Sequence, residues 1–342
     1  MIYLDYSANT PVDARVLEQF CAVERRCIGN ANSHHQAGSA AKAEIDAATI
    51  ASLLGVQPAE IIYTSGASEA NNFALKGLAR LSRHAGRHII STPLEHSSVS
   101  GTLTALQEQG YEIDLLDVKQ DGTVDLEHLK DLLRPDTICV AITLVDSELG
   151  VVQPVQEIAA ILKAYPHCHL HVDATQAVGK IPVSFEGVDT MSLTAHKFYG
   201  LNGIGLLIKR RNLALEPLIH GGESTTIYRS GTPTVALASS LACALDLAVT
   251  DLPGRVDHVA KLNAELRAAL STYPLVRINS PEHAIPYVLN LSVRNVKGTV
   301  FQRELDAKGV CVSVKSACSS DGLPSRAVFA VSRDHCPPGA SA

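Results

Sequence analysis

Tryptophan is absent from this 342-residue sequence, and aromatic residues make up only 4% of it. Proteins that bind single-stranded nucleic acids without sequence preference stack the bases on aromatic rings, so a base-stacking platform is not expected. An excess of basic residues is also missing, because 29 lysines and arginines face 35 acidic residues, giving a formal net charge of -6. The chain therefore offers a polyanion no general electrostatic attraction, and we expect no direct nucleic-acid partner.

Long hydrophobic runs are lacking as well. Residues 1–6 have neither the basic flank nor the apolar run of a secretory signal. The weakly polar stretch 235–248 is short for a membrane span and contains Asp246. The eight cysteines are dispersed and form no C-x-x-C pair, so neither a disulfide framework nor a zinc-finger pattern is indicated. These absences favour a soluble, cytoplasmic protein with reduced thiols and no membrane partner.

The sequence does contain short β-branched runs that alternate with segments of helical length. Such alternation is typical of an α/β protein with a mostly parallel sheet covered by helices. Gly55 stands where a helix should end, and Asp125 and Pro154 stand where helices should begin. We expect strands at residues 61–64, 88–91, 113–116, 138–142, 170–172 and 205–208, and helices at 40–54, 69–82, 126–133 and 155–164.

The length of the chain indicates two domains, because 342 residues exceed what one hydrophobic core usually organises. After Pro253 and Gly254 a new helical pattern begins with apolar residues from Val256 to Leu266, followed by a strand-like segment at 288–293. We therefore expect a large domain at 14–251 and a smaller α+β domain built from 1–13 and 252–342.

Polar residues that follow the expected strands are the first candidates for a functional site, because ligands of open α/β sheets bind at the carboxyl ends of strands. Residues 64–69 form a small-residue loop that opens a helix, which suits an anion but suits a plain helix cap equally well. Asp173 follows another strand. Its carboxylate could pair with the cationic ring nitrogen of an electron-sink cofactor, or it could cap a helix.

Lys197 lies in an apolar, glycine-rich segment, residues 192–205. Burial lowers the pKa of a lysine toward the range in which its amine forms a Schiff base. Thr194 and His196 stand close enough in sequence to meet a phosphate. The alternative is a single charged residue on an ordinary surface turn.

A second constellation consists of alternating residues, His167, His169, His171 and Asp173. On a strand they would share one face, and clusters of this kind can bind zinc. However, His167 follows Pro166 and is expected to precede the strand, and Asp173 already has a candidate role. We therefore expect no metal site.

Eight short segments of the sequence form a pattern when taken together and in order. They are residues 3–11 (YLDYSANTP), 29–30 (GN), 64–72 (TSGASEANN), 95–96 (EH), 172–176 (VDATQ), 195–197 (AHK), 229–232 (RSGT) and 316–320 (SACSS). With these segments the chain resembles the NifS/IscS-like cysteine desulfurases, which belong to the class V aminotransferase group of fold-type I pyridoxal-phosphate enzymes. The likeness runs from Tyr3 to about Arg326.

The resemblance implies a fold-type I enzyme with pyridoxal 5'-phosphate as cofactor and Lys197 as the residue that holds it and later moves a proton. His96 would stack on the ring and assist acid/base steps, and Asp173 would keep the ring nitrogen protonated. Gln176 would contact the ring hydroxyl, near which Ser147 replaces the asparagine usual in the family. The remaining cofactor-binding residues would be Ala67, Ser68, Thr194, Ala195 and His196, with Thr232 reaching the phosphate from the partner subunit of a homodimer.

The resemblance also implies that Cys318 takes the sulfur of L-cysteine as a persulfide, leaving L-alanine. The sulfur would then pass to an acceptor protein, either an iron–sulfur scaffold or a tRNA-thiolation enzyme. A free thiol of pKa about 8.5 is only a few per cent thiolate at neutral pH, so the site must promote its ionisation. Cys318 lies in a segment of small polar residues, 313–322, as expected of a loop that travels between sites.

The sequence departs from the family after Arg326. There the family continues into a strand with an arginine that binds the substrate carboxylate. In this chain Arg326 and Arg333 both precede that position. Residues 337–339 are Pro-Pro-Gly, which cannot form such a strand. Losing a bidentate contact weakens substrate binding and alignment. Two alternatives stay open: a catalytically impaired pyridoxal-phosphate-binding homolog acting as a partner or scaffold, and a selenocysteine lyase.

Overall fold

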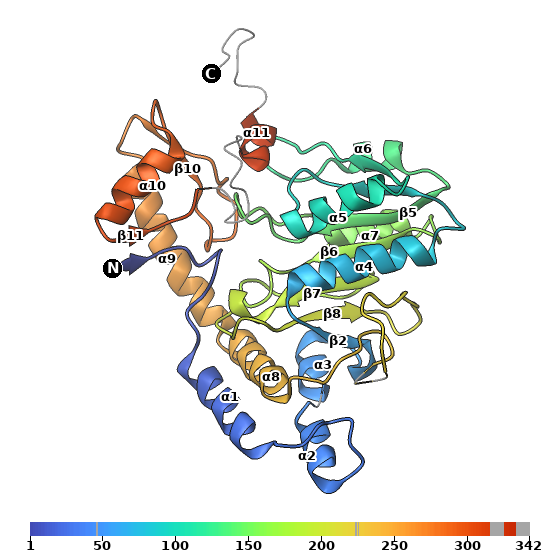
Figure 1. The fold of residues 1–342 in the computed structure, drawn as a ribbon. Helices are drawn as coiled ribbons and strands as arrows, with labels where there is room; N and C mark the ends of the chain where they lie inside the picture. Colours follow the sequence, from blue (N-terminus) through green and yellow to red (C-terminus); the bar gives the residue numbers. More distant parts are fainter. Residues whose placement is uncertain (46, 223, 225, 315–324, 333–342) are drawn as a thin grey trace.

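The computed structural model describes residues 1–45, 47–222, 224, 226–314 and 325–332, and its centre is a sheet of seven strands (Figure 1). Neighbouring strands from β4 to β7 run parallel, whereas β8 runs antiparallel to both β7 and β2. The expected mostly parallel α/β sheet is confirmed. In spatial order the strands are β2 (Ile61–Thr64), β8 (Gly205–Lys209), β7 (Thr190–Thr194), β6 (His169–Asp173), β5 (Thr137–Thr143), β3 (His88–Ser91) and β4 (Glu112–Leu115).

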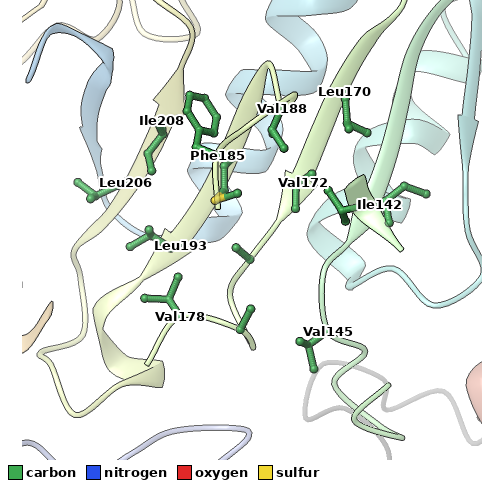
Figure 2. Close-up of a cluster of buried hydrophobic side chains, with 14 of the residues drawn as sticks. Ile142, Val145, Leu170, Val172, Val178, Phe185, Val188, Leu193, Leu206 and Ile208 are labelled. Atoms are coloured by element: carbon green, nitrogen blue, oxygen red, sulfur yellow. The ribbon is translucent and has the colours of Figure 1, made fainter. Parts of the chain in front are cut away.

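Both faces of the sheet are buried, because its central strands are apolar on both sides. In β5 the side chains of Val140 and Ile142 enter one core, while Cys139 and Ala141 enter the other. Figure 2 shows the first core, in which Ile142 packs with side chains from β6, β7 and β8. This two-sided burial is typical of parallel sheets and keeps the strand ends fixed relative to one another.

The helices form the two layers that cover the sheet. The helices α4 (Ala67–Leu81) and α5 (Ser97–Gln107) supply one core, whereas α3 (Ala48–Leu54), α6 (Leu126–Leu132), α7 (Val155–Leu162) and α8 (Val235–Thr250) supply the other. The helix ends expected at Gly55, Asp125 and Pro154 are confirmed. Gly55 ends α3 in the left-handed conformation (φ 65°), Asp125 accepts hydrogen bonds from the N–H groups of Glu127 and His128, and Pro154 precedes α7.

Several elements differ from the sequence expectation. Strand β7 was not expected, because its alternating Thr and Ser residues look like a polar segment although the whole strand is buried. The single helix expected at 40–54 is two helices, α2 (Gln36–Glu44) and α3. The strand expected at 288–293 begins only at Leu291, because Val288 packs into the main core instead. Helices α1 (Ala14–Arg26), α5 and α8 were also missed; α8 is rich in small residues, which weakens its apolar periodicity.

The C-terminal part of the chain contains α9 (Leu252–Leu270), an antiparallel pair β9 (Val276–Ile278) and β10 (Leu291–Val293), α10 (Gly298–Ala307), β11 (Val310–Cys311) and α11 (Arg326–Ser332). Strand β1 (Ile2–Tyr3) pairs in parallel with β11. The division into domains at 14–251 and at 1–13 with 252–342 stays a prediction. Within the described residues no single helix is long and apolar enough to cross a membrane; α8 and α9 meet the requirement only together, across a 66° bend.

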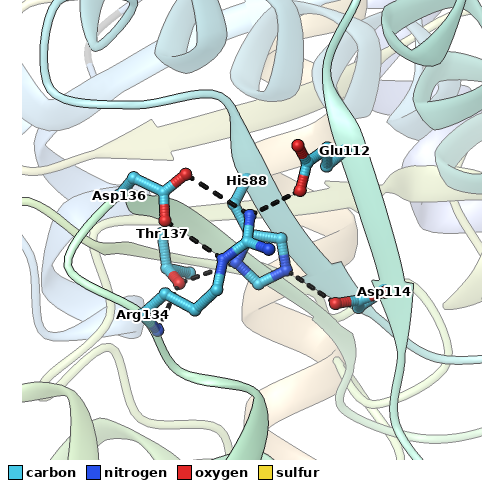
Figure 3. Close-up of polar contacts among 6 residues, drawn as sticks. All are labelled: His88, Glu112, Asp114, Arg134, Asp136 and Thr137. Atoms are coloured by element: carbon cyan, nitrogen blue, oxygen red, sulfur yellow. Dashed lines mark hydrogen bonds and ion pairs between the residues drawn. The ribbon is translucent and has the colours of Figure 1, made fainter.

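A polar cluster joins the starts of β3 and β5 to β4, at the end of the sheet away from the strands' carboxyl termini (Figure 3). The fully buried ring of His88 contacts Thr137 Oγ1 through Nδ1 (2.8 Å) and Asp114 Oδ2 through Nε2 (3.1 Å). Nearby, Arg134 donates to Glu112 at 2.7 Å. These contacts satisfy a buried polar side chain and link three strands in one register.

Gly205 at the start of β8 allows two backbone segments to approach closely. A Cβ atom there would lie 2.6 Å from the carbonyl oxygen of Leu193 and 2.7 Å from the Cα of Gly66. Gly205→Ala is therefore expected to lower the free energy of unfolding by about 1–3 kcal/mol, measured by urea denaturation, because the backbone must move apart. Gly101→Ala is the control: nothing lies within 4 Å of its Cβ in α5, and alanine should stabilise that helix. Equal unfolding midpoints for the Gly205 variant and the parent would contradict the prediction.

Candidate active site

A cavity of about 340 Å³ opens at the carboxyl ends of β2, β5, β6 and β7. Its wall also includes Asp5 and Ser7 from the N-terminal segment and Ser313 from the segment after β11. This is the position at which α/β sheets usually bind ligands. Of the residues predicted from the sequence, the structure brings together Ala67, Ser68, His96, Ser147, Asp173, Gln176, Thr194, His196 and Lys197.

Two of the predicted residues do not line this cavity, and a third cannot be placed. Ala195 is fully buried in the core, whereas the neighbouring Thr194 lines the cavity. The N–H of Ala195 donates to the carbonyl of Ile204. Thr232 is exposed and lies outside the cavity wall. Cys318 lies outside the described residues.

One end of the cavity is suited to an anion. Helix α4 begins after Gly66 without a side-chain cap, and the first N–H that bonds within the helix is that of Ala70. The backbone N–H groups of residues 67–69 therefore have no partner within the helix and can bind a ligand, and the helix dipole favours a negatively charged one. Thr194 Oγ1 lies 3.1 Å from His196 Nδ1 beside this turn. Burial lowers the pKa of His196 to about 4, assisted by the positive charges of Lys197 and Lys180, so the imidazole is neutral at pH 7.

The middle of the cavity contains a carboxylate and an imidazole. Asp173, only 3% exposed, is the last residue of β6 and accepts hydrogen bonds from the N–H of Thr175 (2.9 Å) and the side chain of Asn71 (2.8 Å). His96 caps α5, and its Nδ1 accepts from the N–H of Ser98 at 3.1 Å. Burial lowers the pKa of His96 and Lys197 adds to this effect, whereas Asp173 opposes it. A fixed acceptor and a weakly basic imidazole therefore face the same space.

Lys197 ends the short turn Ala195–Lys197 that follows β7. Its Nζ donates to the carbonyl oxygens of Ser7 (2.6 Å) and Ala8 (2.7 Å), which ties the N-terminal segment to the cavity. Lys180 is buried, and burial followed by the charge of Lys197 lowers its pKa to about 7. Sequence reasoning missed Lys180, although its position in the apolar segment 174–181 is a signal of burial.

The amide of Gln176 is held in one orientation. Its Oε1 accepts from Lys180 Nζ at 2.9 Å, and its Nε2 donates to the carbonyl of Ser7 at 2.9 Å. Asp5 accepts from the Ser313 hydroxyl at 2.6 Å, which joins the N-terminal segment to the residues after β11. The sequence showed residues 3–11 as a motif without a role. The hydrogen bonds of Ser7 and Ala8 with Lys197, together with the pairing of β1 with β11, place this segment at the cavity.

Two enclosed carboxyl groups lie near the site. Burial raises the pKa of Glu95 to about 8, although hydrogen bonds from Thr143 N–H (2.8 Å) and the Thr92 hydroxyl (2.9 Å) oppose it. Its Oε2 is enclosed and has no hydrogen-bond partner among the described residues. Burial likewise raises the pKa of Asp146 to about 7, against the N–H groups of Leu149 and neighbouring residues. Both groups hold their protons into the neutral range.

Glu95→Gln is expected to weaken the pH dependence of stability. The pKa of Glu95 is higher in the folded chain than in the unfolded chain, so between the two values only the folded chain binds this proton. The free energy of unfolding therefore falls as the pH rises from about 5 to about 8. Glu95 contributes a slope of about 1.4 kcal/mol per pH unit. Urea denaturation at about pH 5.5 and about pH 8.5 measures the slope, with the exposed Glu127→Gln as control. An unchanged slope in the Glu95 variant would contradict the prediction.

The alternating histidines have protein partners. His169 lies 3.6 Å from Asp189, and the ring of buried His171 bonds Thr190 and Asn71. As expected, His167 precedes β6. Among the described residues, no group of three or more His, Cys, Asp or Glu side chains is arranged to hold a metal ion.

Comparisons with known proteins give a consistent result. Residues 2–334 match the family model described as aminotransferase class-V. The chain is 40% identical over 332 residues to cysteine desulfurase IscS of Proteus mirabilis, an alignment that covers 94% of this chain and 81% of the relative. A solved NifS-like protein matches with a TM-score of 0.91 and 36% identity over 98% of this chain and 90% of its own. SspA in complex with cysteine matches with a TM-score of 0.85 and 31% identity over 97% and 94%.

Proposed function

The chain belongs to the class-V aminotransferase family, in which it is a NifS/IscS-like cysteine desulfurase, and we propose that Cys318 receives the sulfur of L-cysteine as a persulfide while L-alanine is released. The observation that best supports this proposal is the position of Lys197. Its amine lines the same cavity as Asp173, His96 and the uncapped start of α4. The solved relative in complex with cysteine supports the choice of substrate.

The residues of the cavity fit pyridoxal 5'-phosphate, the cofactor of this enzyme family. The N–H groups of residues 67–69 suit its phosphate, and the carboxylate of Asp173 suits its ring nitrogen. The Thr194 hydroxyl, which donates to the carbonyl of Ile204, would turn from it to reach the phosphate. Gln176 keeps a second Nε2 hydrogen available for the ring hydroxyl, next to the shorter side chain of Ser147. Bound there, the cofactor supplies an electron sink for the charge that develops at the substrate α-carbon.

Proton transfer is assigned to Lys197 and hydrogen bonding to His96. Lys197 Nζ is the amine proposed to hold the cofactor and then to carry the α-proton of cysteine. The Nδ1 atom of His96 already accepts a hydrogen bond from Ser98 N–H, so Nε2 is the ring atom left for the cofactor or substrate. Burial lowers the pKa of His96, so the imidazole is neutral near pH 7 and offers Nε2–H as a donor.

Sulfur transfer is assigned to Cys318. The Cys318 thiolate attacks the sulfur of the substrate, an S–S bond forms, the C–S bond breaks, and the proton given up by the Cys318 thiol ends on the carbon fragment as alanine. Ser313 lines the cavity, and the five residues from there to Cys318 span at most about 18 Å. Cys318 is therefore within chain reach of a substrate beside Lys197.

The partners and location follow as proposals. The exposed Thr232 lies outside its own cavity, which fits a role at the phosphate of a partner subunit in a homodimer. The persulfide of Cys318 would pass to a sulfur-acceptor protein, as in iron–sulfur cluster assembly or tRNA thiolation. We expect this to occur in the cytoplasm.

The deciding experiment uses the purified full chain. Its absorbance between about 350 and 450 nm reports cofactor held by Lys197, and alanine release from L-cysteine reports the reaction. A coloured protein that forms alanine supports the proposal. A coloured protein without turnover would identify an impaired homolog, turnover of selenocysteine alone would identify a lyase, and a colourless protein would contradict cofactor binding.

A further inference from the structure

Asn71 lies fully buried in α4 beneath the cavity, and its amide makes four hydrogen bonds. The Nδ2 donates to Asp173 Oδ2 (2.8 Å) and to Ser98 Oγ (2.9 Å). The Oδ1 accepts from Ser192 Oγ (2.5 Å) and from His171 Nε2 (3.0 Å). One side chain thus contacts both the carboxylate of the site and Ser98, which hydrogen-bonds the imidazole of the site.

The direction of these hydrogen bonds is fixed by chemistry. An ionised Asp173 can only accept, so the nitrogen of Asn71 must face it. Burial lowers the pKa of His171 to about 4, so this ring is neutral, and its Nε2–H donates to the Asn71 oxygen while Nδ1 lies 2.9 Å from Thr190 Oγ1. The amide uses both donors and both acceptor positions, so it has no alternative orientation of equal energy.

The donor and acceptor roles fixed at Asn71 also fix those between Ser98 and His96. Because Ser98 Oγ accepts from Asn71, its own proton is available for His96 Nδ1, which lies 2.9 Å away. The backbone N–H of Ser98 also donates to this Nδ1, at 3.1 Å. A nitrogen that accepts two hydrogen bonds carries no proton, so the proton of the neutral ring is on Nε2.

We propose that Asn71 and Ser98 are positioning residues that act as one unit: Asn71 fixes the carboxylate of Asp173 and, through the Ser98 hydroxyl, holds His96 in the tautomer protonated on Nε2. The unit joins the two groups that face the cavity from β6 and from the start of α5. A ring held in this tautomer offers Nε2–H as a hydrogen-bond donor, while its basic nitrogen, Nδ1, is occupied by Ser98. The inference rests on the proposed function in that Asp173 and His96 serve the cofactor.

Other groups also act on His96. Asp173 from β6 raises its pKa, and Lys197 from the turn after β7 lowers it. The adjoining Glu95 carboxyl holds its proton to about pH 8. The two charged groups act in opposite directions, which leaves the uncharged donors of Ser98 to decide which ring nitrogen is protonated.

Ser98→Val and Ser98→Thr form a matched pair, because they differ only in a methyl group for a hydroxyl. The full chain, freed of cofactor by dialysis and carrying isotope-labelled histidine, is titrated by NMR, and a His96→Gln variant identifies the His96 signal. A donor to the unprotonated ring favours the neutral form, so Ser98→Val should raise the pKa of His96 by at least about 0.5 unit, whereas Ser98→Thr should leave it near the parent value. Identical titrations of both variants and the parent would overturn the proposal.

Asn71→Leu tests whether the two positions act as one unit. It should also raise the pKa of His96, and the double variant with Ser98→Val should raise it no further than the larger single effect. Independent, additive shifts would show that Ser98 acts without Asn71 and would overturn the coupling. If Asn71→Leu does not fold, the Ser98 pair still decides the tautomer.

Cofactor affinity gives a second readout. Asn71→Leu should weaken pyridoxal 5'-phosphate binding by about tenfold or more, measured by absorbance titration, because Asp173 loses a donor. The control Asn72→Leu, whose amide donates only to the carbonyl of Ser68 in the same helix, should stay within about twofold of the parent. A parent chain that binds no cofactor would remove the proposed function but leave the His96 titration as a valid test.

Discussion

Replacing Lys197 by alanine is expected to abolish the absorbance of the bound cofactor near 420 nm, by an order of magnitude or more, and to reduce alanine formation from L-cysteine by about 10⁴-fold. The side chain is the proposed covalent anchor and proton carrier, and no other described lysine lines the cavity. The buried Lys180 cannot replace it, because its amine is engaged with Gln176. Rapid alanine analysis after mixing with substrate measures the loss.

The control for this variant is Lys163→Ala, which removes an exposed lysine at the end of α7. It should retain both the absorbance and the rate of the parent. Circular dichroism and urea denaturation of both variants would show that the fold is intact. A Lys197 variant that still forms alanine at more than about one per cent of the parent rate would contradict the assignment.

Replacing Cys318 by alanine is expected to leave the cofactor absorbance unchanged and to reduce alanine formation by at least about 100-fold. The thiolate is the nucleophile that accepts sulfur, and without it the C–S bond of the substrate has no efficient route to cleavage. Mass spectrometry of the parent after one turnover should find one additional sulfur atom on the peptide that contains Cys318.

Cys311→Ser provides the matched control in the same part of the chain. Cys311 lies in β11, half-buried and seven residues before Cys318, and it should not carry sulfur. This variant should therefore keep the parent rate and the labelled peptide. Loss of the persulfide in the Cys311 variant, with its retention in the Cys318 variant, would move the acceptor role to the other thiol.

Much of the fold was predictable from the sequence, because the central strands are short apolar runs and two helix ends carry capping residues. Strand β7 was not, since Thr190, Ser192 and Thr194 look polar although all are buried within the sheet. Periodicity identifies a strand by one apolar face, and a strand whose hydroxyl groups are satisfied inside the protein lacks that signal.

The candidate site was predictable only where residues fall directly after strands or in recognisable motifs. Nine of the predicted residues line the cavity for that reason. Asn71 was missed because it lies within a helix and its contact with Asp173 joins residues about 100 positions apart. Such a contact depends on tertiary packing, which a single sequence does not display. Lys180 was missed because it lies in a turn without a recognisable motif, although its partner Gln176 is only four positions away.

The pairing of β1 with β11 determines when the site can be completed during synthesis. Residues 2 and 3 are synthesised well before their partners, residues 310 and 311, which follow roughly 300 residues later, about 15–60 s at ~5–20 residues per second. Until then β1, which precedes Asp5, Ser7 and Ala8, has no partner strand. The nascent central sheet can therefore form well before the N-terminal wall of its cavity is fixed.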